Sequence, residues 1–265
     1  MKSNIEAFHK ALLKAENVFV ITGAGISVAS GIHAFRGTDP DAVWNRDVLE
    51  KGTYAYFEEN TLDSWLWYLD RFSSLMGKQP NPGHDALFGL EKWCAQVNKK
   101  FTLVTQNIDG LHLDAGNKDT IEVHGTVRKV RCTNLRCMNA EPKGSIPFPT
   151  AQVQRLLQQK THSELPTCPA CGSVVRPHVL WFDEYYTAHE DYQFEHMQSL
   201  LYDADIHIFI GTSFSVGVTA SVQNVAQMKR QEIWIIDPVQ PDVEQEHRWL
   251  EGGAEILLPQ LLERL

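Results

Sequence analysis

The chain has 265 residues, of which 43% are hydrophobic and 22% are charged, as in an ordinary globular protein. Disordered and fibrous chains are thereby excluded, and the length is sufficient for one large domain with a small insertion. The 24 basic and 33 acidic residues give a net charge of −9, which offers no general attraction to nucleic acid or to an anionic membrane.

The N-terminal sequence MKSNIEAFHKALLKAENVFV is charged and lacks the apolar core of a secretory signal. No segment reaches the roughly 18 consecutive apolar residues that span a membrane. The five cysteines are an odd number, which argues against a disulfide framework. Together these features predict a cytoplasmic protein.

Strands and helices are predicted to alternate along most of the chain. Four apolar runs have the length of buried strands, at residues 18–22, 101–105, 206–211 and 233–237. Helical spacing of apolar residues is found at residues 3–16, 86–97 and 219–229. This alternation predicts the α/β class, with a doubly wound parallel sheet.

Two segments interrupt the alternation. Residues 40–80 are rich in aromatic side chains and have a helical pattern, whereas residues 125–178 contain two cysteine pairs, several prolines and little periodicity. We interpret both segments as insertions that together form a smaller lobe, separated from the sheet domain by a cleft.

The predicted strand at residues 18–22 leads directly into a glycine turn, GAG, at residues 23–25. Glycines in this position let main-chain N–H groups approach a pyrophosphate. No Lys-Ser or Lys-Thr follows, which excludes a P-loop, and Val28 stands in the place of the third glycine of a dinucleotide fingerprint. A tight turn without a ligand is therefore an alternative. The same loop also carries a hydroxyl, an aromatic ring and a permanent cation, in Ser27, Phe35 and Arg36.

Polar side chains follow the predicted strand at residues 101–105. Gln106, Asn107 and Asp109 lie at its carboxyl end, where open α/β sheets bind ligands, although they could instead cap the next turn. His124 follows another short apolar run. Histidine is the side chain best suited to accept a proton near neutral pH, but a structural role for it stays open.

Four of the five cysteines form two close pairs. Cys132 and Cys137 are spaced C-x4-C, and Cys168 and Cys171 are spaced C-x2-C. Such pairs suit tetrahedral zinc, and four thiolate ligands leave no open position for catalysis. We therefore predict one structural Zn²⁺ that fastens the smaller lobe, in preference to a redox-active pair of cysteines.

The order of these motifs resembles that of the sirtuins, the NAD-dependent protein deacylases. The resemblance covers GAGISVASGIHAFRG, TQNIDGLH, EVHG, both cysteine pairs, VLWFDE, GTSFSV and GGAEILLPQL. It implies a Rossmann-like NAD-binding domain made of residues 1–39, 81–124 and 179–265. The smaller lobe would consist of a helical module, residues 40–80, and a zinc-binding module, residues 125–178.

The resemblance also implies roles for individual residues. His124 would be the catalytic base, and Asn107 and Asp109 would position the nicotinamide ribose. NAD would be bound by a larger set that lines its pyrophosphate, riboses and adenine: Gly23, Ala24, Gly25, Ser27, Phe35, Arg36, Gln106, Asn107, Asp109, Gly211, Thr212, Ser213, Asp237 and Ala254.

In the sirtuin mechanism, the amide oxygen of an acyl-lysine attacks C1′ of the nicotinamide ribose, and nicotinamide leaves. His124 would then deprotonate a ribose hydroxyl, and the products would be free lysine, nicotinamide and acyl-ADP-ribose. The first step needs placement and exclusion of water more than a strong nucleophile. The side-chain amides of Gln106 and Asn107 suit that task.

The predicted helical module contains Tyr68 and Arg71, at positions i and i+3. This pair resembles the tyrosine and arginine by which one sirtuin subgroup recognises malonyl-, succinyl- or glutaryl-lysine, because a guanidinium and a phenol suit a terminal carboxylate. Gly52 falls where that subgroup has a small residue. The alternative is a surface arginine beside a core aromatic ring. The substrate would also contact Val179, Trp181 and Phe182.

Three positions depart from the sirtuin pattern. Asp183 replaces a common glycine in the substrate-binding strand, Asp237 replaces a common asparagine, and the first cysteine pair is spaced by four residues instead of two. None of these is a predicted catalytic residue, so we expect an active enzyme that acts on acyl-lysine proteins as a monomer. The alternatives are ADP-ribosyl transfer to protein, hydrolysis of NAD, or NAD binding without catalysis.

Overall fold

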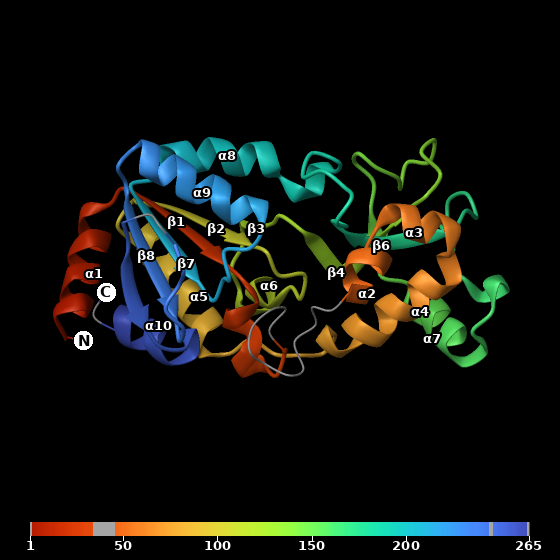
Figure 1. The fold of residues 1–265 in the computed structure, drawn as a ribbon, viewed down its shortest axis with the longest axis horizontal. Coiled ribbons are helices and arrows are strands. Elements are labelled where there is room, and N and C mark those ends of the chain that lie inside the picture. The colour runs from red at the N-terminus through yellow and green to blue at the C-terminus, as the bar shows by residue number, and fades with distance from the viewer. Residues whose placement is uncertain (1, 34–45, 244–245, 264) are drawn as a thin grey trace.

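The computed structural model describes residues 2–33, 46–243, 246–263 and 265. Its larger part is a six-stranded sheet in the order β3-β2-β1-β7-β8-β9, and all neighbouring strands are parallel (Figure 1). The order reverses beside β1, as in a Rossmann sheet, which confirms the predicted doubly wound fold. The strands are β1 (Asn17–Thr22), β2 (Lys100–Thr105), β3 (Thr120–Glu122), β7 (Ile206–Ile210), β8 (Glu232–Asp237) and β9 (Arg248–Glu251).

Alternate residues of the central strands point into two separate apolar cores. In β1, Val18 and Val20 belong to one core, and Phe19 and Ile21 belong to the other. Helices α1, α5 and α10 close the first core, and α8 and α9 cover the opposite face (Figure 1). The bounds of these helices are α1 (Lys2–Lys14), α5 (Pro82–Gln96), α8 (Phe194–Asp203), α9 (Gly217–Met228) and α10 (Ala254–Leu262).

The smaller lobe contains a three-stranded antiparallel sheet, β5-β4-β6, with helices packed around it (Figure 1). A single hydrophobic cluster joins Trp65 and Leu69 of the helical segment to Val130 and Val175 of the cysteine-bearing segment. The two insertions therefore share one core. The elements are α2 (Arg46–Lys51), α3 (Tyr54–Glu59), α4 (Thr61–Phe72), β4 (Gly125–Cys132), β5 (Ile146–Pro147), α7 (Thr150–Gln159) and β6 (Val175–Val179).

Two helices differ from the sequence prediction. Helix α7 lies in a segment where we predicted little periodicity, because only Val153 and Leu156 of it are buried. Helix α5 begins at Pro82, earlier than predicted, because the side chain of Asn81 caps its first turn and a proline suits the first helical position. None of the described helices is long and apolar enough to cross a membrane. The shorter elements are η1 (Ala24–Ser30), η2 (Ser73–Leu75), α6 (Leu111–Ala115), η3 (His162–Glu164) and η4 (Glu190–Tyr192), where η denotes a 3-10 helix.

Candidate active site and zinc site

The glycine turn lies where the strand order of the large sheet reverses. The main-chain N–H of Gly25 donates to the carbonyl oxygen of Gly211 at 2.9 Å, which joins the chain after β1 to the chain after β7. A Cβ atom on Gly25 would lie 2.6 Å from Cα of Gly211, and one on Gly23 would lie 2.7 Å from its carbonyl oxygen. Only main-chain atoms fit here, at the edge of the sheet where such folds bind ligands.

Five side chains that we predicted to contact the cofactor lie in hydrogen-bonded groups beside this turn. The hydroxyl of Ser27 donates to Asp109 Oδ2 at 2.8 Å, and Asn107 Nδ2 donates to Ser27 Oγ at 3.1 Å. Gln106 Nε2 donates to Thr212 Oγ1 at 3.1 Å. The segments after β1, β2 and β7 thus place these polar groups together, and Asn107 and Asp109 are buried.

The two carboxylates of the predicted cofactor set are both partly withdrawn from solvent. Burial raises the pKa of Asp109, although hydrogen bonds from the Leu111 N–H and the Ser27 hydroxyl act in the opposite direction. Burial also raises the pKa of Asp237, the last residue of β8, whose carboxylate accepts the Val239 N–H at 2.9 Å. Both carboxylates therefore have fixed main-chain donors that hold their orientation.

The imidazole of His124 lies between the main chain at Gln106 and the side chain of Tyr186. Its Nδ1 lies 2.8 Å from the carbonyl oxygen of Gln106, so Nδ1 carries the proton and donates it to that oxygen. The lone pair is then at Nε2, which lies 3.3 Å from the hydroxyl of Tyr186. Burial lowers the pKa of His124, although the hydrogen bond to Gln106 acts to raise it. A neutral imidazole with its lone pair at Nε2 is the form that a general base needs.

Tyr186 is a site residue that the sequence analysis missed. Its ring stacks on Phe194, with centroids 4.6 Å apart and an interplanar angle of 18°, and this packing directs the hydroxyl to His124. The segment FDEYY has no spacing that relates it to His124, so no pattern in the sequence signals the contact.

A second missed feature is a pair of buried histidines below the glycine turn. The rings of His84 and His112 lie 4.8 Å apart, and Nε2 of His112 is 2.9 Å from the hydroxyl of Thr22. Burial lowers the pKa of both rings, to about 4 for His84. Both rings are neutral, and His112 supports the end of β1 through Thr22, whereas Nε2 of His84 lies 3.5 Å from Ser27 Oγ. The motif PNPGH is a sequence signal for His84, because its side chain accepts the main-chain N–H of the residue that caps α5.

The remaining predicted cofactor residues are at the same edge of the sheet. Gly211, Thr212 and Ser213 follow β7, and Ala254 begins α10. Gly211 has a φ of +59°, a conformation that favours glycine. Two further predicted residues, Phe35 and Arg36, lie outside the described residues.

The predicted acyl pocket centres on α4. The ring of Tyr68 is buried, its hydroxyl has no hydrogen-bond partner among the described residues, and burial raises its pKa. The guanidinium of Arg71 lies 5.3 Å from the ring centroid of Trp67. A Cβ atom on Gly52 would lie 2.5 Å from the carbonyl oxygen of Val48, so this position has no room for a side chain.

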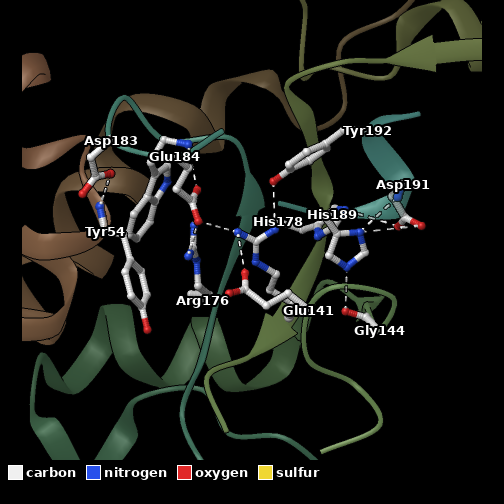
Figure 2. Close-up of polar contacts among 12 residues, drawn as sticks. Tyr54, Glu141, Gly144, Arg176, His178, Asp183, Glu184, His189, Asp191 and Tyr192 are labelled. Atoms are coloured by element: carbon white, nitrogen blue, oxygen red, sulfur yellow. Dashed lines mark hydrogen bonds and ion pairs between the residues drawn. The ribbon is translucent and has the colours of Figure 1, made fainter. Parts of the chain in front are cut away.

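The predicted substrate-binding strand continues from β6. Val179 and Trp181 are buried, whereas Phe182 is exposed and its main-chain N–H donates to Gly52 O at 3.0 Å. Asp183, which departs from the sirtuin pattern, accepts hydrogen bonds from the main-chain N–H groups of Tyr54 (2.7 Å) and of its neighbour along α3 (3.0 Å). Its carboxylate therefore caps the first turn of α3 (Figure 2).

The next residue, Glu184, is the centre of a buried ionic network. Its carboxylate accepts two hydrogen bonds from Arg176, both at 2.7 Å (Figure 2). It accepts a third from Arg131, also at 2.7 Å. Its Oε2 also accepts the main-chain N–H of Trp181 at 2.9 Å. Despite burial, the hydrogen bonds and charges of the arginines lower the pKa of Glu184. This network ties the predicted substrate-binding segment after β6 to Arg131 of β4 and Arg176 of β6.

The four paired cysteines converge at one end of the small sheet. The sulfur atoms of Cys132 and Cys171 are 3.4 Å apart, and those of Cys137 and Cys168 are 3.7 Å apart. All four sulfurs lie within 4.8 Å of one another. Zinc bound tetrahedrally at the usual Zn–S distance of about 2.3 Å requires sulfurs roughly 3.8 Å apart. The cluster therefore fits one structural zinc ion, as predicted.

The sequence profile of the Sir2 family matches residues 23–218, which is most of the chain. The chain belongs to the Sir2 family. It is 32% identical, over 99% of its length and 77% of the relative, to the NAD-dependent deacetylase sir2E of Dictyostelium discoideum. It is 35% identical to the mitochondrial NAD-dependent protein deacylase sirtuin-5 of Canis lupus familiaris, over 69% of this chain and 61% of the relative.

Solved Sir2 structures have the same fold. A crystal structure of a Sir2 homologue in complex with NAD has a TM-score of 0.79 and 30% identity to this chain, covering 98% of it and 93% of that homologue. In this Sir2 chain, Gly25 and Gly211 expose main-chain groups without side chains at the carboxyl end of the strands. Ser27 and Asn107 lie beside these glycines. These features fit the pyrophosphate and ribose of NAD.

Proposed function

We propose that this Sir2 chain is a deacylase that prefers lysines carrying malonyl, succinyl or glutaryl groups to acetyl-lysine. At the coarser level it is an NAD-dependent protein deacylase, as the Sir2 family match and the curated relatives support. When bound, NAD supplies the glycosidic bond that is broken and the ribose that receives the acyl group.

The residues of the site act by orientation and proton transfer. The Ser27, Asn107 and Asp109 network would hold the ribose, and its buried donors and acceptors need no rearrangement during the reaction. His124 would accept a ribose hydroxyl proton at Nε2, because Nδ1 is committed to the carbonyl of Gln106.

The hydroxyl of Tyr68, which has no hydrogen-bond partner among the described residues, is the observation that supports the acyl preference. A buried hydroxyl without a hydrogen bond costs about 1–3 kcal/mol, and a carboxylate at the end of the acyl chain would remove that cost. Arg71, one helical turn further along α4, would supply a guanidinium to the same carboxylate. An acetyl group has no oxygen at this position, so it would gain from neither residue.

The test compares succinyl-lysine and acetyl-lysine peptides of the same sequence, with NAD, for the wild type, Arg71→Met and Tyr68→Phe. We expect the wild type to prefer the succinyl peptide. Arg71→Met should lower kcat/KM for that peptide by at least about tenfold, since a charged hydrogen bond contributes roughly 1.5–3 kcal/mol. Both variants should leave acetyl turnover nearly unchanged.

Arg155→Met is the matched control, because Arg155 is an exposed arginine of the same lobe that pairs with Glu164. Preference of the wild type for acetyl, or an equal loss for both peptides in Arg71→Met, would contradict the proposal. Mass spectrometry of the products provides a separate check on the coarser activity. Acyl-ADP-ribose supports deacylation, whereas free ADP-ribose with an unchanged peptide would indicate a glycohydrolase.

We also propose that the enzyme acts as a cytoplasmic monomer that binds acyl-lysine proteins and no nucleic acid. The net charge of −9 supports the last point, because it opposes binding to a polyanion. Light scattering coupled to size exclusion, and DNA titration at low salt, would test these two properties; a dimer or salt-sensitive DNA binding would refute them.

A further inference from the structure

Three potential metal ligands meet at the end of the small sheet that is remote from the cysteines. His178 lies on β6, and His189 and Asp191 lie at η4 (Figure 2). Along β6, His178 is three residues beyond Val175, which pairs with Cys132, so roughly 10 Å of strand separates the two places.

The geometry of these three side chains matches that of metal ligands. Nε2 of His178 is 3.3 Å from Asp191 Oδ2, and Nδ1 of His189 is 4.0 Å from Asp191 Oδ1. The three ligand atoms all lie within 4.8 Å of one another. Ligands bound to a tetrahedral zinc at about 2.0–2.1 Å lie roughly 3.3–3.4 Å apart, so a small closure of the cluster would bring them into range.

His178 is the second observation that points to a ligand. Its side chain is 1% exposed, Nδ1 makes no hydrogen bond within the described part of the chain, and Nε2 faces the carboxylate of Asp191 at 3.3 Å. A buried imidazole nitrogen without a partner is uncommon, because unmet hydrogen-bonding capacity is costly. His178, Asp191 and Glu122 are among the residues that line a cavity of about 160 Å³. This cavity provides an entry path and room for water to complete the coordination.

His189 already has the tautomer and the orientation of a metal ligand. Its Nε2–H donates to the carbonyl oxygen of Gly144 at 3.1 Å, which leaves the lone pair at Nδ1 on the side of Asp191. Metal-bound histidines usually donate their other N–H to a carbonyl or carboxylate in this way. Nδ1 now accepts the main-chain N–H of Asp191 at 3.1 Å, and an ion would replace that one hydrogen bond.

A lysine supplies positive charge to the cluster. Lys129 Nζ lies 3.0 Å from Asp191 Oδ2, and the hydroxyl of Ser145 donates to the same oxygen at 3.0 Å. The side chain of Lys129 is 46% exposed, so it can move into solvent when another cation arrives. Lys129 and a metal ion would therefore compete for the same carboxylate.

We propose that His178, His189 and Asp191 bind one divalent transition-metal ion of the zinc type, at a site separate from the four-cysteine site. Two imidazoles and one carboxylate suit Zn²⁺, Co²⁺ or Ni²⁺ better than Mg²⁺ or Ca²⁺, which prefer oxygen ligands. The bound ion links η4 to β6 and holds the segment that carries Tyr186.

The test titrates Co²⁺ into the full chain with zinc already bound at its cysteines. Cobalt held by imidazole and carboxylate gives weak visible bands, whereas cobalt that has displaced zinc from thiolates gives intense near-ultraviolet absorption. We expect a saturable visible band with one additional ion per chain, and elemental analysis of zinc-saturated protein should give two zinc ions per chain.

Two variants should change this second site in opposite directions. His178→Gln should weaken Co²⁺ binding by more than about tenfold while the cysteine-bound zinc is retained. Lys129→Gln should tighten it several-fold, because a competing charge is removed. Asp191→Asn replaces His178→Gln if the latter fails to fold, as judged by its thermal transition. A single zinc per chain in the wild type, or a Co²⁺ affinity that none of these variants alters, would overturn the proposal.

Discussion

The large domain and the smaller lobe are each stabilised internally in a different way. The large domain has parallel strands whose side chains are buried on both faces, in two apolar cores. The smaller lobe has one core, and to it are added the cysteine cluster and the buried network of Glu184 with Arg131 and Arg176. A sheet covered on both faces is stabilised by apolar burial, whereas a small lobe needs metal or charge pairs to fix its shape.

We predict that this difference separates cofactor binding from substrate recognition. The large domain supplies the glycine turn, Asn107 and Asp109, and the smaller lobe supplies Tyr68 and the strand that leads to Phe182. Damage confined to the smaller lobe should therefore reduce substrate recognition before it alters the cofactor edge of the sheet.

Removal of the structural zinc should have the largest effect. A chelator should unfold the smaller lobe and abolish deacylation, because structural zinc contributes on the order of 10 kcal/mol to folding in small zinc domains. Hydrogen exchange should then show lost protection in β4 and β6 and retained protection in β1 and β7. Cys168→Ala should reproduce the effect, and Cys94→Ala, which removes the one cysteine buried in the large domain, is the matched control. Uniform loss of protection in both regions would refute the comparison.

The buried ionic network should give the next largest effect. Glu184→Gln removes the charge that two buried arginines share, and breaking such a pair costs about 3–5 kcal/mol in free energy of unfolding. Asp63→Asn is the control, because it breaks the more exposed pair with Lys51, whose contribution should be about 1 kcal/mol or less. Denaturant melts measure both. Similar values for the two variants would show that burial of the network does not matter.

A substitution that creates a cavity in the core of the large domain should destabilise only that domain. Leu12 is fully buried in the core under α1, and Leu12→Ala should lower the free energy of unfolding by about 3 kcal/mol. Exchange protection should fall in β1 and β7, while the zinc content and the protection of β6 stay unchanged. A simultaneous loss of zinc would mean that the two regions unfold as one unit.

The smallest expected effect concerns the contact between His124, the predicted catalytic base, and Tyr186 in the loop after β6. Burial lowers the pKa of His124 below the ordinary histidine value of about 6.5. The base should therefore be neutral, and kcat/KM should be high, at every pH above 6.5. Activity should then decline as the pH falls through the lowered pKa. Tyr186→Phe removes a hydroxyl that donates to the neutral ring, which should raise the pKa of His124 and move the acid limb to higher pH.

The pH dependence of kcat/KM for the wild type and Tyr186→Phe measures this shift. Tyr185→Phe is the control, since Tyr185 is an exposed neighbour. An acid limb above pH 6.5 in the wild type, or no displacement of it in Tyr186→Phe, would contradict the assigned proton positions.

Much of the fold and part of the site could be predicted because they depend on local pattern. Buried parallel strands appear as apolar runs, and the predicted strand ends agree with the observed ones to within one residue. The glycine turn and the two cysteine pairs are set by spacing within short segments. Even the placement of Asn107 beside Ser27 follows from strand ends that share one edge of a parallel sheet.

Other contacts could be found only in the tertiary structure. The pair of His124 and Tyr186 spans 62 residues, and the cap of α3 by Asp183 spans 129. No periodicity relates residues at such separations, since their meeting depends on how the small sheet packs against the helices. The sequence by itself determined four strands of the sheet and the zinc ligands, and it singled out His124 as the candidate base, because each follows from neighbouring residues. Only the folded chain decided what orients that candidate base and what holds the predicted substrate-binding segment, because those partners come from distant segments.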